Sequence, residues 1–251
     1  MPIALDLDGV IWLADVPIPG SAEAVAALRA AGECVVFVTN NSSQPVGEVE
    51  AKLARHGIPA AGDVLTSATA AAGLVQPGER VLVVGGPGVV EALERRGAVP
   101  VVEGDADAVL VGFDKSFTYD RLRIAAAAVR EGARLLATND DATYPTPDGP
   151  IPGGGAILAA VVAATGMTPQ VAGKPYAPMA ALVRARLGPT GVMVGDRVDT
   201  DGLFAHRLGY RFALVHTGIT GADEPVEPAP DLVAADLAAL VGLLVDTDTK
   251  G

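Results

Sequence analysis

The chain has 251 residues, 50% of them hydrophobic and 19% charged, a balance that is typical of a globular protein and excludes an intrinsically disordered one. Its 18 Lys and Arg against 30 Asp and Glu give a net charge of −12, which would repel nucleic acid backbones and anionic membranes, so neither is expected as a partner. A chain of this length is expected to hold two modest domains.

The cysteine content and the N-terminal sequence favour a cytoplasmic protein. Cys34 is the only cysteine, so no internal disulfide can form and a secreted disulfide framework is excluded. The apolar segment 3–7 has no basic region before it and no cleavage pattern after it, so no signal peptide is predicted. The apolar segment 156–164 is too short for a membrane span, which needs about 20 residues.

Apolar runs alternate with segments of helical period along the chain. A strand at Ile3–Leu7 comes before a helix that ends at Gly32, and a second strand at Val35–Val38 comes before a helix that Pro45 opens. This alternation predicts an α/β fold with a mainly parallel sheet covered by helices on both faces. Later strands are predicted at 81–84, 108–111, 135–137, 192–194 and 212–215, with helices near 89–95, 119–130, 156–164, 179–187 and 203–208.

Two carboxylates end the first predicted strand. Asp6 and Asp8 are two residues apart and so lie on the same side of an extended chain, and Gly9 allows the chain to turn sharply after them. Ligands of open α/β sheets bind at the carboxyl ends of the strands, where such a pair can hold a divalent cation or divide the work of nucleophile and acid–base catalyst. Because Asp is also common in ordinary turns, the pair alone leaves both interpretations open.

The second predicted strand ends in Thr39-Asn40-Asn41-Ser42-Ser43, a run of hydroxyls and amides just before a helix. Hydroxyls, loop N–H groups and the amino end of a helix all favour an anion such as phosphate. Ser42 or Ser43 is also expected to cap the helix, and the two interpretations do not exclude each other.

A lysine and a cluster of acids follow later in the chain. Lys174 precedes a proline, which favours an extended conformation, although an isolated lysine is usually exposed to solvent. Asp196, Asp199 and Asp201 come directly after a predicted strand. Such a cluster is costly without a cation such as Mg²⁺. Acids at the start of a helix also favour its dipole, and Asp199 is expected to do only that.

Taken together and in this order, these stretches resemble the haloacid dehalogenase-like phosphohydrolases. The resemblance rests on Asp6-x-Asp8-Gly9, Thr39 after a strand, Lys174, and Gly195-Asp196 followed by Asp201. The detailed motifs are similar to the NagD-like and p-nitrophenyl phosphatase subfamily, which includes phosphoglycolate and pyridoxal phosphate phosphatases, and they span nearly the whole chain. Ala14, where relatives often carry Gly, and Gly202, where they commonly have Ile, depart from the pattern.

The resemblance implies a Rossmann-like parallel-sheet core at residues 1–75 and 168–251, interrupted by an inserted α/β cap domain at 76–167. It also implies a division of chemical roles. Asp6 would attack phosphorus and become an aspartyl-phosphate, while Asp8 would protonate the leaving alkoxide and later activate water. Lys174 would balance the charge on Asp6 and on the phosphate.

Metal and substrate ligands are implied in the same way. The implied Mg²⁺ ligands are Asp6, the backbone carbonyl of Asp8, Asp196 and Asp201. Asp201 would position Lys174 or a metal-bound water. The loop from Asn139 to Tyr144 is expected to close over the leaving group and set specificity, with packing inside the cap as the alternative role of Tyr144. Thr39 and Asn40 would grip phosphoryl oxygens, and the full set of substrate-binding candidates is Gly9, Thr39, Asn40, Asn41, Asn139, Asp141, Tyr144 and Lys174.

The implied function is that of a Mg²⁺-dependent phosphatase acting on small-molecule phosphomonoesters. Glycerol phosphate, phosphoglycolate, sugar phosphates, pyridoxal phosphate and nucleotides all stay open as substrates, and so does a homo-oligomer formed through the cap. Gly86-Pro87-Gly88 leaves a dinucleotide-binding oxidoreductase as an alternative, although the third glycine of that pattern is missing. A receiver-like module that accepts phosphate for signalling is the other alternative, and the presence of Asp8 beside Asp6 favours turnover over it.

Overall fold

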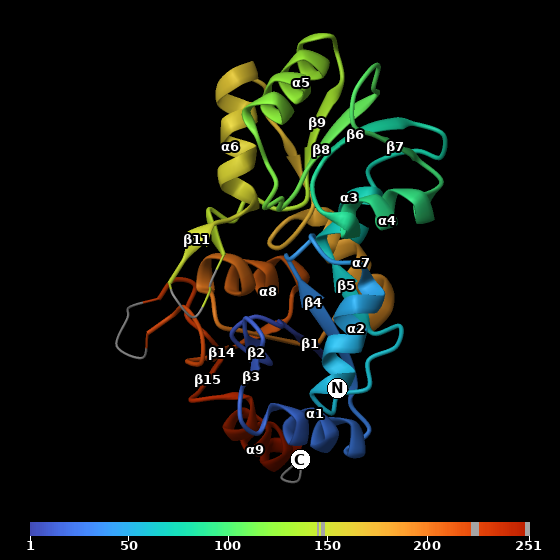
Figure 1. Cartoon of the computed structure of the whole chain (residues 1–251). Helices are drawn as coiled ribbons and strands as arrows, with labels where there is room; N and C mark the ends of the chain where they lie inside the picture. Colours follow the sequence, from blue (N-terminus) through green and yellow to red (C-terminus); the bar gives the residue numbers. More distant parts are fainter. Residues whose placement is uncertain (145, 147–148, 222–225, 249–251) are drawn as a thin grey trace.

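Two parallel sheets organise the chain, and one lies above the other in Figure 1. The computed structural model describes residues 1–144, 146, 149–221 and 226–248. The strands of the first sheet are β1 (Pro2–Leu5), β4 (Cys34–Thr39), β5 (Val64–Thr66), β13 (Val192–Gly195), β14 (Arg211–Val215) and β15 (Leu232–Ala234). In the described ranges they follow the order β15-β14-β13-β1-β4-β5, and every neighbouring pair is parallel.

Helices cover both faces of the first sheet, as the alternating pattern predicts. One face packs against α1 (Ser21–Ala30), α2 (Val46–Arg55) and α9 (Leu237–Asp248), and the other against α3 (Ser67–Ala72), α7 (Ala177–Leu187) and α8 (Leu203–Leu208). Along β4, Val35 and Phe37 face the first group while Val36 and Val38 face the second, because successive side chains of a strand point to opposite sides. The predicted α/β fold is therefore confirmed. Within the described ranges no helix is long and apolar enough to cross a membrane.

The second sheet is built in the same way. Its strands are β6 (Arg80–Val84), β7 (Val99–Val101), β8 (Ala108–Val111), β9 (Arg134–Ala137) and β12 (Gln170–Val171), which in the described part of the chain follow the order β12-β9-β8-β6-β7. Helices α5 (Tyr119–Arg130) and α6 (Gly154–Thr165) cover one face, and α4 (Pro87–Arg96) covers the other. Because β12 pairs with β9, this sheet extends past residue 167, the expected end of the inserted segment.

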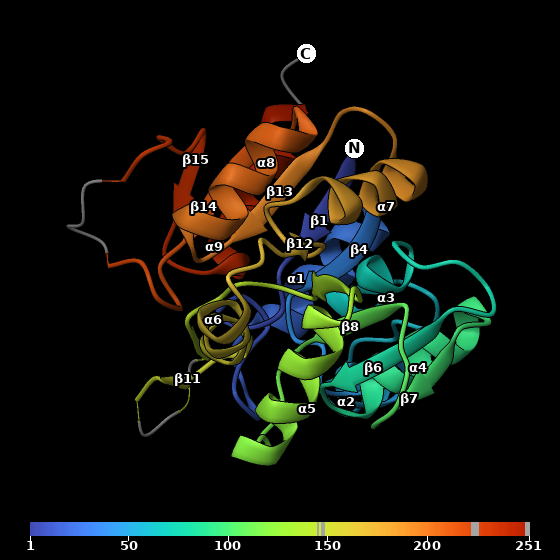
Figure 2. The ribbon, with the colours of Figure 1, turned by 90° about the horizontal axis from the view of Figure 1, so that it is seen from above.

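An apolar cluster and a polar loop join the two sheets. Seen from above in Figure 2, α3 lies beside the second sheet, and its buried alanines belong to the same cluster as the side chains of α4, β6 and β8. The loop at 40–44 meets the start of α4, where Gly88 donates its N–H to the Ser43 carbonyl at 3.1 Å. A Cβ on Gly88 would lie 2.2 Å from the carbonyl oxygen of Gln44, so this position has no room for a side chain. The glycines that resemble a dinucleotide-binding turn therefore serve close packing between the sheets.

Two short hairpins stand at the edge where the sheets meet. One is formed by β2 (Trp12–Leu13) and β3 (Val16–Pro17), and the other by β10 (Thr143–Tyr144) and β11 (Ile151–Pro152). The first hairpin begins early because β1 ends at Leu5 rather than at Leu7. The Leu7 carbonyl accepts the N–H groups of Val10, Ile11 and Trp12, and this turn folds the chain back over the end of β1.

The β2–β3 turn contains a strained residue. Ala14 has φ 52°, a left-handed conformation that costs a residue with a Cβ about 1–2 kcal/mol. We expect Ala14→Gly to raise the free energy of unfolding by up to about 1 kcal/mol, since Gly removes this cost but adds entropy to the unfolded chain. Urea denaturation measures the change. The exposed Ala31, at φ −75°, is a matched control whose change to Gly should lower stability by about 0.5 kcal/mol, and a loss in both variants would contradict the expectation.

Candidate active site

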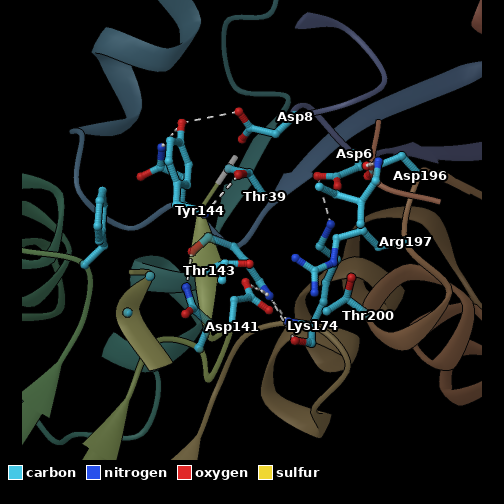
Figure 3. A pocket seen from close by; sticks show the side chains of 17 residues that line it. Asp6, Asp8, Thr39, Asp141, Thr143, Tyr144, Lys174, Asp196, Arg197 and Thr200 are labelled. Atoms are coloured by element: carbon cyan, nitrogen blue, oxygen red, sulfur yellow. Dashed lines mark hydrogen bonds and ion pairs between the residues drawn. The ribbon is translucent and has the colours of Figure 1, made fainter. Parts of the chain in front are cut away.

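The carboxyl ends of three adjacent strands bring most of the predicted site residues together. β13, β1 and β4 are neighbours in the first sheet, and Asp196, Asp6 and Thr39 stand at their ends. A cavity of about 60 Å³ opens there, between the first sheet and residues of the β10–β11 hairpin (Figure 3). Of the predicted catalytic, metal-binding and substrate-binding residues, all except Gly9 and Asp201 line this cavity. This is the edge at which open α/β sheets bind ligands.

Lys174 is buried between two acids. Its Nζ lies 2.8 Å from Asp6 Oδ1 and 2.6 Å from Asp201 Oδ1, and its side chain is only 3% exposed. Burial opposes the charge on Lys174, but the carboxylates of Asp201 and Asp6 raise its pKa above the ordinary value. Burial raises the pKa of Asp6, and Lys174 offsets part of that shift. The isolated lysine of the sequence is thus the buried cation that balances Asp6 and Asp201.

Asp196 is held tightly at the end of β13. Its Oδ2 accepts the N–H of Ile219 at 2.7 Å, and Gly9 packs directly against its carboxylate, where a Cβ would come within 2.4 Å. Gly9 donates its own N–H to the Trp12 carbonyl, so its part in the site is to leave room for Asp196. Burial, and after it the charge of Asp201, raises the pKa of Asp196 to about 7. Oxygen atoms of Asp6, Asp196 and Asp201 all lie within 4.8 Å of one another, a set able to hold a cation.

Asp8 faces the cavity from the turn after β1. Its Oδ1 accepts the indole N–H of Trp12 at 3.2 Å and the hydroxyl of Tyr144 at 3.4 Å. Burial raises the pKa of the Asp8 carboxyl, an effect that favours its neutral, proton-donating form. Tyr144 comes from β10 and also stacks on Phe113, with ring centroids 5.3 Å apart. A side chain of the β10–β11 hairpin therefore reaches directly to the strand-end acids.

The loop after β4 does not cap α2 as predicted. α2 has Pro45 at its N-cap and no side-chain cap, so the prediction for Ser42 and Ser43 is wrong. Ser43 instead donates its hydroxyl to Asn41 Oδ1 at 2.7 Å. The Ser42 hydroxyl accepts a hydrogen bond from Thr138 at 3.0 Å, so it ties the first sheet to the second.

Asn40 connects the two sheets at the cavity. Its amide nitrogen donates to Asp141 Oδ2 and to the Lys174 carbonyl, each at 3.0 Å, and its Oδ1 accepts the Lys174 N–H at 2.8 Å. Asn139 in turn donates its side-chain amide to the Asn40 carbonyl. These bonds occupy both ends of the Asn40 side chain, which holds Lys174 and Asp141 in place. Burial raises the pKa of Asp141, and the hydrogen bond from Asn40 offsets part of that shift.

Arg197 and Phe113 line the cavity although the sequence reasoning missed them. Arg197 Nε and Nη2 donate to Asp199 Oδ1 and Oδ2 at 3.2 and 2.9 Å, and this paired contact fixes the guanidinium at the cavity wall. Asp199, predicted to act only on a helix dipole, is thus an ion-pair partner. The position of Arg197 between two of the three clustered acids could have indicated its place in the site, whereas nothing in the sequence around Phe113 indicates a role for that residue.

Comparisons with family models and with known proteins find similarity over most of the chain. Family models described as haloacid dehalogenase-like hydrolase and HAD-hydrolase-like match residues 3–99 and 171–240. The chain is 38% identical over 250 residues to a D-glycerol 3-phosphate phosphatase of Mycobacterium tuberculosis, covering 95% of this chain and 70% of that protein.

Solved structures show the same likeness over nearly the whole chain. A 4-nitrophenylphosphatase of Thermotoga maritima superposes with a TM-score of 0.89 at 34% identity, covering 96% of each chain. A glycerol phosphate phosphatase of Mycobacterium tuberculosis, solved in complex with magnesium, gives a TM-score of 0.86 at 36% identity, covering 95% of this chain and 75% of that one. The chain therefore belongs to the haloacid dehalogenase-like hydrolase family, as an enzyme of the phosphatase type.

Proposed function

We propose that the protein hydrolyses small-molecule phosphomonoesters by transferring the phosphoryl group to Asp6 and then to water. The observation that carries this proposal is the position of Asp6, whose Oδ1 lies 2.8 Å from the buried Lys174 Nζ at a cavity-lining strand end. A carboxylate attacks phosphorus as an anion, and the neighbouring ammonium keeps that anion stable in a buried site.

The step at Asp6 forms one bond and breaks another. A carboxylate oxygen of Asp6 bonds to phosphorus while the ester P–O bond breaks, and the leaving oxygen takes a proton from Asp8. Asp8, now ionised, removes a proton from the water that attacks the aspartyl-phosphate, which returns Asp6 and releases phosphate. Thr39, at the end of β4, faces the same cavity and would hold phosphoryl oxygens through its hydroxyl.

The acidic cluster fits Mg²⁺, because three buried carboxylates gather in one place and, among the described residues, Lys174 is the only cation in contact with them. The carboxylates of Asp6 and Asp196 and the backbone carbonyl of Asp8 would hold the ion. Both carboxylate oxygens of Asp201 are already engaged, one by Lys174 and the other by the Arg197 N–H at 3.2 Å, so we assign Asp201 to positioning Lys174. When bound, Mg²⁺ offsets the repulsion between the nucleophile and the phosphate.

Mg²⁺ should stabilise the metal-free protein, since it binds only the folded acid cluster. At about 100 times its Kd we expect roughly 2.7 kcal/mol of added stability, seen as a higher melting temperature. Asp196→Asn should remove most of this gain. Asp199→Asn should keep it, because Asp199 is 69% exposed and paired with Arg197. A melting temperature of the parent protein that does not respond to Mg²⁺ would disprove the metal site.

We assign the second sheet and the β10–β11 hairpin to a cap that selects the leaving group, with Asn139, Asp141 and Tyr144 at its contact with the phosphate site. In support, each of these side chains lines the cavity. A phosphate-release screen with Mg²⁺ tests the function and ranks substrates. It should include glycerol phosphate, phosphoglycolate, sugar phosphates, pyridoxal phosphate and nucleotides. Release from none of these esters would contradict the proposal.

A further inference from the structure

One hydrogen bond to the Asp8 carboxyl comes from a residue outside the cavity. Trp12 donates its indole N–H to Asp8 Oδ1 at 3.2 Å, and Trp12 does not line the cavity. Trp12 as a whole residue is only 3% exposed, and a buried Trp N–H needs an acceptor. The direction of this N–H therefore depends on how the indole ring is fixed in the core.

Lys52 on α2 fixes that ring. Its Nζ lies 4.1 Å from the centroid of the Trp12 ring, in a cation–π contact, and 3.1 Å from Asp15 Oδ1. The same ammonium donates to the carbonyl of Ala14, in the turn of the β2–β3 hairpin. The Lys52 side chain is 11% exposed, which is rare for a lysine unless its charge has a partner. One buried cation thus holds both the hairpin turn and the face of Trp12.

We propose that Trp12 and Lys52 act together as positioning residues that aim the Asp8 carboxyl at the leaving oxygen of the ester. The Lys52 ammonium contacts the face of the indole and donates a hydrogen bond to a backbone carbonyl in the β2–β3 turn. The indole N–H then holds Oδ1 of Asp8, the oxygen that also accepts the Tyr144 hydroxyl, and proton transfer falls to Oδ2. This inference rests on the proposed role of Asp8 as the proton donor.

Proton transfer requires the donor to lie within hydrogen-bond reach of the leaving oxygen, and a misplacement of about 1 Å can cost about 100-fold in rate. An alkyl ester depends on this proton because an alkoxide is a poor leaving group. The p-nitrophenolate anion needs little protonation. A misplaced Asp8 carboxyl should therefore lower the rate of cleavage of the alkyl ester selectively, whereas damage to the fold should lower the rates for both esters alike.

The experiment compares kcat/KM for glycerol phosphate and for p-nitrophenyl phosphate, because this ratio reports the steps up to cleavage of the ester bond. Trp12→Phe keeps an aromatic ring but removes the N–H. We expect it to lower the value for glycerol phosphate about 10-fold or more and to leave the value for p-nitrophenyl phosphate within about 2-fold. Lys52→Met should show the same pattern, and Lys52→Arg should restore it to near the parent level, because arginine also binds aromatic faces.

Two further variants make the outcome decisive. Tyr210→Phe removes a hydrogen bond that a buried aromatic ring makes to the Gly188 carbonyl, and it should leave the substrate ratio unchanged. Asp8→Asn should lower the ratio most. If Asp8→Asn changes the ratio and Trp12→Phe does not, the positioning role is wrong. If Asp8→Asn itself leaves the ratio unchanged, the proposed acid role of Asp8 fails instead.

Discussion

Asp6→Asn should lower kcat by at least about 10⁴-fold on every phosphomonoester, since removal of a nucleophile that forms a covalent intermediate costs several orders of magnitude. The amide has the shape of the carboxylate but cannot attack phosphorus. Asn also removes one negative charge from a buried acidic cluster, so we expect the fold to survive the change. Phosphate release at saturating substrate and Mg²⁺ measures the loss.

The control for Asp6→Asn is the melting curve of the same preparation. A melting temperature near that of the parent, together with lost turnover, assigns the effect to chemistry. Retention of more than about a hundredth of the parent rate by a folded variant would remove Asp6 from the nucleophile role.

Lys174→Met should be the most destabilising single change in the site. Asp201 is fully buried and Asp6 is 7% exposed, so the variant leaves buried carboxylates without their cation. Breaking a buried ion pair from one side costs about 3–5 kcal/mol, and we expect a loss of that size in the free energy of unfolding in excess EDTA at about pH 8. At about pH 5 the loss should be smaller, because burial raises the pKa of Asp6 and its protonated form needs no cation.

Lys115→Met is the matched control for Lys174→Met. Lys115 is exposed and stands on the loop after β8, so its change to Met should alter stability by less than about 0.5 kcal/mol. Urea denaturation of both variants measures the difference between a buried and an exposed lysine. A loss below about 1 kcal/mol in Lys174→Met would show that Lys174 is not the cation on which the acid cluster depends.

Local sequence patterns were enough to predict the fold class and the acids at the strand ends. β1 and β13 are apolar runs that end directly in Asp6 and Asp196, and the topology of parallel sheets then brings both acids to one edge. The predicted helices at 119–130 and 203–208 are confirmed to the residue. The Gly202 departure leaves α8 in place, because the chain forms a π-helical turn at Val198–Gly202 just before it.

Short or uniform segments escaped prediction. β5, β7 and β15 have three residues each, too few for a periodic pattern. α3 consists of small residues and has no distinct apolar face, since all of its residues except the half-buried Thr69 are buried between the two sheets. These elements owe their structure to tertiary packing, which the local sequence does not encode.

The connections among site residues were equally hidden, because they join positions far apart in the chain. Asn40 meets Asp141 across 101 residues, and Lys52 reaches Asp15 only because α2 packs beside the β2–β3 hairpin. Asn40 was predicted to bind phosphate from its place after a strand. Its hydrogen bonds to Lys174 and Asp141 depend on how the second sheet packs against the first, and no spacing in the sequence indicates that packing.

The covalent step at Asp6 is tested most directly in the Asp8→Asn variant with p-nitrophenyl phosphate. Its leaving anion needs little protonation, so phosphoryl transfer should proceed, while hydrolysis of the aspartyl-phosphate should stall without its base. We predict a rapid burst of p-nitrophenolate equal to the amount of enzyme, with one phosphoryl group on the peptide that contains Asp6 after acid quenching and mass spectrometry. Release without a burst, or a phosphoryl group on any other residue, would contradict the mechanism.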